Sequence, residues 1–62
     1  LLTGRQLDVL QLLSKGLSNK EIASELFLST RTVDMHMRNL FDRLGCHSRW
    51  DAVEKGRELG LI

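Results

Sequence analysis

The stretch from Ser29 to Gly45 constrains the fold most, because it predicts one long amphipathic helix. Its apolar side chains recur at helical spacing, within roughly 60° of arc at about 100° per residue. They are Val33, Met37, Leu40 and Leu44. Ser29 is a suitable N-cap and Gly45 suits the left-handed residue that ends a helix. We therefore expect a helix over 30–44 that buries this stripe. The opposite, exposed side then carries Arg31, Asp34, Met35, Arg38 and Asp42.

Two capping boxes predict two helices before this stretch. In each box a hydroxyl residue is followed three positions later by Gln or Glu, as in Thr3–Gln6 and Ser18–Glu21. The first helix ends at Gly16 and should be mostly buried through a wide apolar stripe. That stripe comprises Leu7, Val9, Leu10, Leu12 and Leu13. The second helix is short, about two turns long.

The two helices over 19–26 and 30–44, joined by a three-residue turn, match a helix-turn-helix. The longer helix rises roughly 22 Å at 1.5 Å per residue, enough to cross a DNA major groove about 12 Å wide. Such turns often contain Gly, whereas this turn contains Phe27. We expect Phe27 to keep a negative φ, since a positive φ is rare for a bulky residue.

A fourth helix should begin after Ser48 and end at Gly60. On one side, within roughly 100° of arc, it carries Trp50, Val53, Glu54 and Arg57. On the other side it carries Ala52, Gly56 and Leu59, which we expect to pack against the bundle. Leu61 and Ile62 should fold back onto the core. Spacing alone leaves Trp50 equally compatible with the core and with a dimer interface.

Length and composition predict a single all-α domain over residues 1–62. The chain contains no proline, its net charge is only +1, and its one cysteine cannot form an internal disulfide, which suits a reducing cytoplasm. No stretch approaches the roughly 18 apolar residues of a membrane span, and no signal peptide is visible. Because the sequence opens with Leu-Leu-Thr, we expect an excised domain whose N-terminal regulatory domain is missing.

Catalytic and metal-binding patterns are missing from the sequence. There is no glycine-rich phosphate loop and no Gly-x-Ser-x-Gly elbow, so we expect neither an enzyme nor a cofactor site. His36 has no second ligand four residues later, and the adjacent Cys46 and His47 lack partner spacing for zinc. Cys46 is instead expected to pack as a small hydrophobe.

The chain resembles the DNA-binding domain of LuxR-type transcription regulators, the family that includes GerE and the NarL group of response regulators. The matching residues are Leu2-Thr3, Arg5, Val9-Leu10, Gly16, Ser18 to Ala23, Leu26, Ser29, Thr32-Val33, His36, Asn39, Leu44-Gly45, Arg49 and Ala52-Val53. The resemblance implies a four-helix fold, a tetrahelical helix-turn-helix. It also implies that the third helix enters the major groove and that the fourth helix dimerises.

The resemblance also implies roles for individual residues. Base-edge contacts fall to Asp34, Met35 and Arg38, and phosphate contacts to Asn19, Lys20, Ser29, Thr30, Arg31 and Thr32. For Trp50 it favours the dimer interface, together with Val53, Glu54 and Arg57. Two positions depart from the family pattern: Gln6 replaces the usual Glu, and Asp34 stands where many members carry Lys. Asp34 cannot help with phosphates, but it could accept from a cytosine amine or simply reject other bases.

We therefore predict sequence-specific binding of double-stranded DNA by the C-terminal output domain of a bacterial transcription regulator. A homodimer is the expected form, and RNA polymerase is a further candidate partner. One alternative is a sigma-factor-like helix-turn-helix that works within RNA polymerase. The other is a helical protein-interaction module that never meets DNA, an alternative that the near-neutral charge keeps open.

Overall fold

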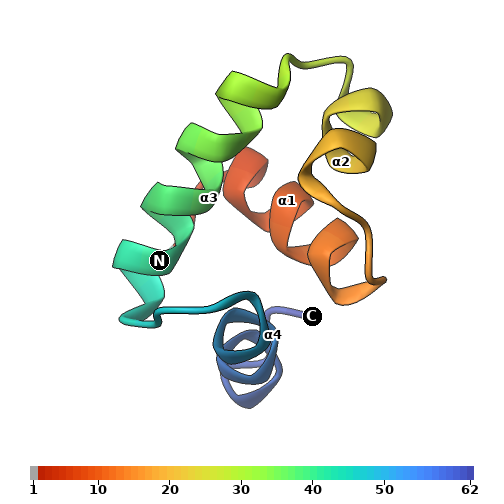
Figure 1. Ribbon diagram of the computed structural model, residues 1–62. Helices are drawn as coiled ribbons and strands as arrows, with labels where there is room; N and C mark the ends of the chain where they lie inside the picture. The colour runs from red at the N-terminus through yellow and green to blue at the C-terminus, as the bar shows by residue number, and fades with distance from the viewer. Residues whose placement is uncertain (1) are drawn as a thin grey trace.

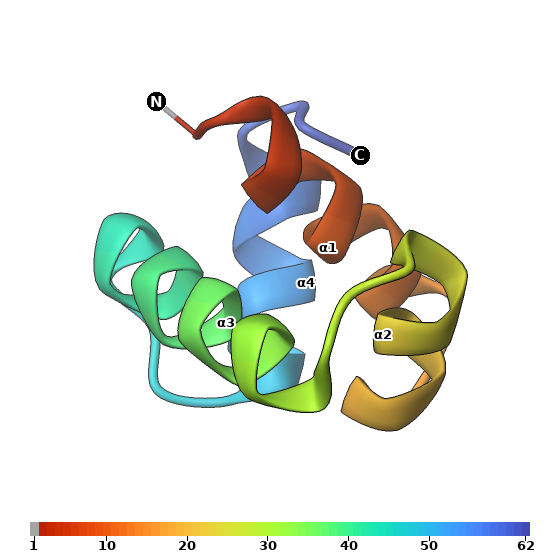
Figure 2. The ribbon, with the colours of Figure 1, turned by 90° about the horizontal axis from the view of Figure 1, so that it is seen from above.

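The chain folds into four helices around one small core. The computed structural model describes residues 2–62 and contains α1 (Gly4–Ser14), α2 (Asn19–Leu26), α3 (Thr30–Leu44) and α4 (Arg49–Glu58). These residues contain no β-strand. Figures 1 and 2 both show α1 in the middle, with α3 on one side of it and α2 on the other. The prediction of an all-α, four-helix fold with a helix-turn-helix is confirmed.

Every helix begins at a hydroxyl N-cap, because each first turn leaves backbone amides that need an acceptor. The four caps are Thr3, Ser18, Ser29 and Ser48. Both predicted capping boxes are present with reciprocal hydrogen bonds. In the second box the Ser18 N–H donates to Glu21 Oε1 at 2.8 Å, and Ser18 Oγ accepts from the Glu21 N–H at 3.2 Å. Local sequence therefore decides where each helix begins.

The core lies between α1 and α3 and is closed by α2 and α4. α1 and α3 each pack against all three other helices, whereas α2 and α4 do not pack against each other. The predicted α3 stripe is buried, and it meets buried side chains from the other helices. The complete buried apolar set is Val9, Leu10, Leu13, Ile22, Ala23, Val33, Met37, Leu40, Leu44 and Ala52.

α4 approaches α1 closely because it presents small residues to it. Ala52 and Gly56 are buried, and a Cβ added at Gly56 would lie 2.8 Å from Leu10 Cδ2. The prediction that Leu59 also packs is wrong, since its side chain is 49% exposed. Leu59 caps the end of α4, and the chain reverses at Gly60, where φ is 71°. The reversal brings Leu61 and Ile62 onto the core in its place, as predicted for these two residues.

Phe27 lies in the left-handed region, with φ 57° and ψ 40°, so the prediction of a negative φ is wrong. The end of α2 requires this conformation. The Leu28 N–H donates to the Ala23 carbonyl at 2.9 Å, and the Phe27 N–H donates to the Ser24 carbonyl, which is the Schellman pattern. The other three helices end with the same pattern around Gly16, Gly45 and Gly60. Satisfying the last carbonyls of α2 therefore outweighs the conformational preference of the side chain.

Replacing Phe27 with glycine should stabilise the domain. The Phe27 side chain is 95% exposed and has little burial to lose, whereas a left-handed residue with a Cβ costs about 1–2 kcal/mol. We expect Phe27→Gly to raise the free energy of unfolding by about 1 kcal/mol in urea denaturation. Phe27→Ala is the matched control, because it removes the ring but keeps the Cβ. Equal stability of the Gly and Ala variants would contradict strain at this position.

Candidate nucleic-acid interface

The outer side of α3 is open to solvent along its length. The residues predicted there are all exposed: Arg31, Asp34, Met35, Arg38 and Asp42. Met35 is 54% exposed and adds a large apolar side chain to this surface. No other helix covers this side, because α3 turns its buried stripe toward α1, α2 and α4. The predicted base-contact residues Asp34, Met35 and Arg38 therefore lie together on one accessible helix surface.

The residues predicted to contact phosphate lie at the starts of α2 and α3. Lys20, Thr30 and Arg31 are exposed, and Thr32 is half-buried. Ser29 is engaged in its own cap, since its Oγ accepts from the Thr32 N–H at 3.1 Å and donates to Thr32 Oγ1 at 2.9 Å. Helix N-termini attract anions through their free N–H groups and dipole. The two helix starts are therefore chemically suited to a phosphate backbone.

Asn19 is not free in this structure, although it was predicted to contact phosphate. Its Nδ2 donates to Asp34 Oδ1 at 2.8 Å, and its Oδ1 accepts from Arg49 Nη1 at 2.8 Å. Arg49 Nη2 in turn donates to the Leu17 carbonyl at 2.7 Å. We call this chain of hydrogen bonds the Arg49 bridge. Sequence analysis missed it, because each of its hydrogen bonds joins residues 15 to 32 positions apart.

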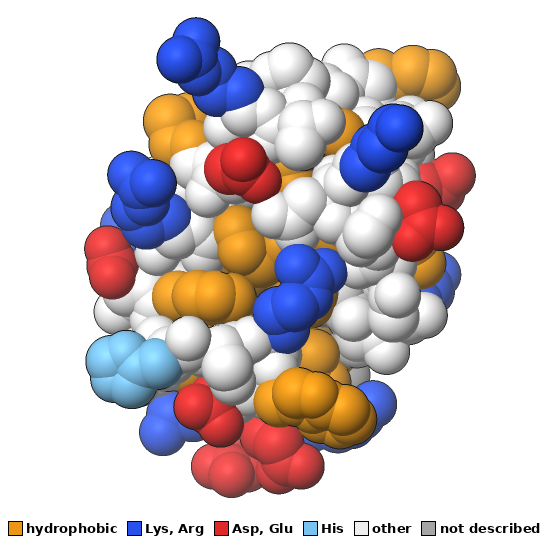
Figure 3. All heavy atoms as spheres, viewed as in Figure 1, with side chains coloured by type: hydrophobic (Ala, Val, Ile, Leu, Met, Phe, Trp, Pro, Cys, Tyr) orange, Lys and Arg blue, Asp and Glu red, His pale blue; other side chains and the backbone are white. Residues whose placement is uncertain are grey.

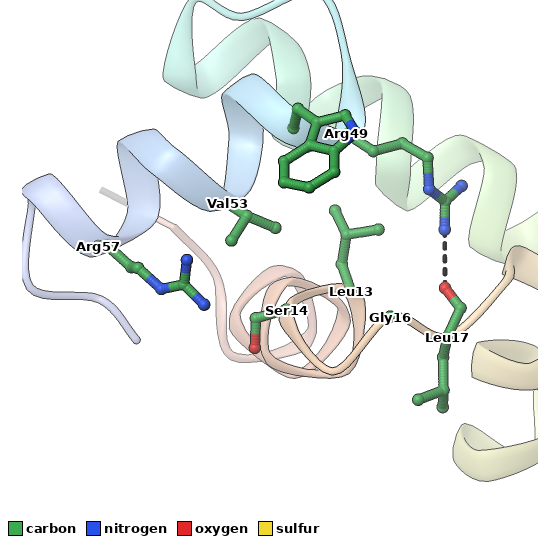
Figure 4. Close-up of a pocket in the computed structure, with 8 residues that line it drawn as sticks. Leu13, Ser14, Gly16, Leu17, Arg49, Val53 and Arg57 are labelled. Atoms are coloured by element: carbon green, nitrogen blue, oxygen red, sulfur yellow. Dashed lines mark hydrogen bonds between the residues drawn. The ribbon is translucent and has the colours of Figure 1, made fainter.

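A shallow groove of about 420 Å³ lies at the surface where α1 and α4 meet. Figure 4 shows Val53 and Arg57 on one side of it and Leu13 and Ser14 on the other. Trp50 also lines the groove and is 83% exposed, so the alternative that placed Trp50 in the core is excluded. Of the four residues predicted for dimerisation, Glu54 does not line the groove. Both Glu54 and Arg57 are exposed, and Val53 is half-buried.

Charge is dispersed over the face of the molecule that Figure 3 shows. On the face in Figure 3, Lys and Arg side chains are separated by other side chains and do not merge into one patch. On this face, recognition of an anion therefore depends on the placement of individual cations. Cys46 is half-buried against the core, as predicted, and burial together with the negative charge of Asp51 raises the pKa of its thiol. Residues 2–62 contain no cluster of three metal-ligating side chains and no helix long and apolar enough to span a membrane.

The fold and the exposed side of α3 define a helix-turn-helix DNA-binding domain. Comparison with known families agrees with this class. Residues 1–55 match the model of the bacterial regulatory proteins, luxR family, and the chain belongs to that family. Its members are regulatory proteins of a non-enzymatic, DNA-binding family.

Relatives of known name support the assignment. The chain is 52% identical over 48 residues to a nitrate/nitrite response regulator protein homolog of Haemophilus influenzae, covering 77% of this chain and 23% of that protein. It is 43% identical over 61 residues to the fimbriae Z protein of Salmonella typhimurium, covering 98% of this chain and 29% of that protein. The chain thus spans less than a third of these two curated relatives.

Two solved structures share the fold. The transcription factor GerE superposes with a TM-score of 0.90 at 37% identity, covering 97% of this chain and 90% of GerE. The response regulator ChrA of a heme-sensing two-component system superposes with a TM-score of 0.97 at 37% identity, covering 100% of this chain and 31% of ChrA. The predicted resemblance to LuxR-type domains is confirmed.

The cap of α2 should make stability sensitive to acid. Hydrogen bonds from the backbone N–H and the side chain of Ser18 lower the pKa of Glu21 from its ordinary value of 4.5. A carboxyl whose pKa is lowered by folding stabilises the fold above its unfolded pKa and loses that contribution as the pH falls through its folded pKa. We expect the stability difference between the wild type and Glu21→Gln to shrink as the pH drops below 4.5, in thermal melts at a series of pH values. Gln6 shows that an amide can complete such a box, so the variant should fold. A difference that stays constant with pH would contradict this role of Glu21.

Proposed function

We propose that this chain binds double-stranded DNA sequence-specifically, with α3 in the major groove, as the C-terminal output domain of a bacterial transcription regulator. One observation carries the proposal: α3 buries one side of the helix in the core and leaves Arg31, Met35 and Arg38 exposed on the other side. A helix that offers base-reading side chains on its free side is the common means of reading a major groove.

Arg38 is the strongest base reader in this proposal. Its guanidinium can donate two hydrogen bonds to the O6 and N7 of a guanine, the commonest specific contact in the major groove. Met35, one turn before it, offers an apolar surface suited to a thymine methyl group. Asp34 is an acceptor suited to a cytosine amine. Lys20, Thr30 and Arg31, at the two exposed helix starts, would hold the backbone phosphates.

The relatives and the α1–α4 groove support a proposal for the partners. The nitrate/nitrite regulator is named as a response regulator and is much longer than this chain, so we place a regulatory domain before α1. The exposed Trp50 side chain would join two copies through α4, together with Val53, Glu54 and Arg57. Two copies would occupy half-sites about one helical turn apart. The cytoplasm is the expected location, and RNA polymerase is a further candidate partner.

A salt titration tests DNA binding directly. With about four or five phosphates neutralised, the logarithm of affinity for duplex DNA should fall with the logarithm of salt concentration at a slope near −4. The bound sites would first be selected from random duplex DNA. A helical protein-interaction module predicts no salt-dependent retention of DNA. A sigma-factor-like domain predicts a monomer that associates with the polymerase core.

Within this test, Arg38→Ala should lose about 1–3 kcal/mol on the selected site and flatten the preference at one base pair. Arg5→Ala is the matched control, because Arg5 lies on α1 and pairs with Asp8 at 3.7 Å. This control should bind like the wild type. Equal losses by Arg38→Ala on all sequences would mean that Arg38 contacts only phosphate.

Removing the Trp50 ring should weaken pairing but not folding. Because the ring is 83% exposed, Trp50→Ala should melt near the wild-type temperature yet occupy paired half-sites less fully in a mobility-shift titration. Leu59→Ala removes another exposed apolar side chain of the same helical region and serves as the control. Unchanged occupancy of paired half-sites by Trp50→Ala would remove α4 from the dimer interface.

A further inference from the structure

We propose that Arg49 is a positioning residue for DNA recognition. Through Asn19 it fixes the carboxylate of Asp34 on the exposed side of α3, and so sets the base preference at one position of the DNA site. This proposal rests on the proposed function. It adds a residue that lies on α4 and outside the exposed side of α3.

The first step is the anchoring of Arg49. Its two terminal nitrogens bind different acceptors, Nη1 the Asn19 side chain at 2.8 Å and Nη2 the Leu17 carbonyl at 2.7 Å. A planar guanidinium held at two nitrogens has a defined orientation. Figure 4 shows the bond that Arg49 makes to Leu17, in the segment between α1 and α2. Because α2 and α4 do not otherwise pack together, the Arg49 bridge links the starts of these two helices.

The second step is the orientation of the Asn19 amide. A guanidinium can only donate hydrogen bonds, and an ionised carboxylate can only accept them. An amide placed between them satisfies both in one orientation, with oxygen toward Arg49 and nitrogen toward Asp34. The hydrogen bonds follow this arrangement, since Asn19 Nδ2 donates to Asp34 Oδ1 at 2.8 Å. Arg49 thus determines that a donor, and not an acceptor, faces Asp34.

The third step is the consequence for Asp34. With Oδ1 engaged by Asn19, Oδ2 remains as an acceptor of this exposed side chain. Asp34 and Arg38 are four positions apart on α3, a spacing at which opposite charges pair readily on a helix. No ion pair joins them in the part of the chain that the structure describes. The Arg49 bridge therefore keeps the carboxylate directed toward Asn19 and leaves the Arg38 guanidinium available to a base.

The chemistry of the positioned group defines what it selects. A carboxylate held in one orientation favours a base edge that offers a hydrogen-bond donor. In the major groove these donors are the amines of cytosine and adenine. The carboxylate disfavours guanine and thymine, which present acceptors to it. A carboxylate that rotates freely would lose much of this discrimination, because it could turn toward Arg38 or toward water. Replacing Arg49 is thus expected to reduce the difference in affinity between DNA sequences, whereas replacing a purely structural residue would lower the affinity for all sequences equally.

The experiment measures base preference. It uses four duplexes that differ at a single base pair. This base pair is the one at which Asp34→Ala loses the preference of the wild type. Arg49→Met keeps the apolar stem and removes both donors. In this variant we expect the ratio of affinities for the best and the worst duplex to fall about fivefold, the effect of losing one hydrogen bond. In the Asp34→Ala background the same substitution should leave the ratio unchanged. Lys55→Met, on the exposed surface of α4, is the matched control and should keep the wild-type ratio.

A second variant keeps the test decisive if Arg49→Met fails to fold. Asn19→Asp can still accept from Arg49, and an acidic residue is favourable in the first turn of a helix. The new carboxylate cannot donate to Asp34 and repels it. The affinity ratio of this variant between the best and the worst duplex should therefore also fall. An unchanged ratio in these variants, or a loss that persists without Asp34, would overturn the role of Arg49. Failure of the wild-type domain to retain any selected duplex would instead overturn the proposed function itself.

Discussion

Burial of one stripe of α3 is the interaction on which the rest of the structure depends. Val33 and Leu40 are fully buried, and Met37 and Leu44 are nearly so. A chain of this length buries only about 60% of its unfolded surface, so it has few alternative ways to close a core. Once this stripe faces α1, helical periodicity directs Arg31, Met35 and Arg38 outward. The same packing that stabilises the domain therefore orients the side chains available to DNA.

Features set by neighbouring residues were predictable from sequence, and features set by distant ones were not. The N-caps and the α3 stripe depend on residues within one or two turns, and the structure has them where the sequence placed them. The Arg49 bridge joins residues up to 32 positions apart, and no pattern of neighbouring residues in the sequence predicts it. The candidate base-contact residues were placed on the exposed side of α3 correctly, but the hydrogen bond that orients Asp34 was not foreseen.

The two wrong predictions share a physical cause. Phe27 was judged by the conformational preference of its side chain, and Leu59 by its hydrophobicity. In both cases the backbone at a helix end decided the outcome. The carbonyls at the end of α2 impose a left-handed residue on Phe27, and the reversal at Gly60 replaces Leu59 with Leu61 and Ile62 at the core. Helix ends are positions where hydrogen-bond satisfaction outweighs the preferences of single side chains.

Arg49 takes part in two separate features of the structure. It lines the α1–α4 groove beside Trp50, and it also holds Asn19. A subunit seated in that groove would meet the same guanidinium that orients the Asp34 carboxylate. Linkage requires such coupling to be reciprocal: if association through the groove tightens the hold on Asp34, binding of the preferred operator must strengthen association by the same factor. Cooperativity between half-sites would then depend on the operator sequence, and one arginine would carry the coupling.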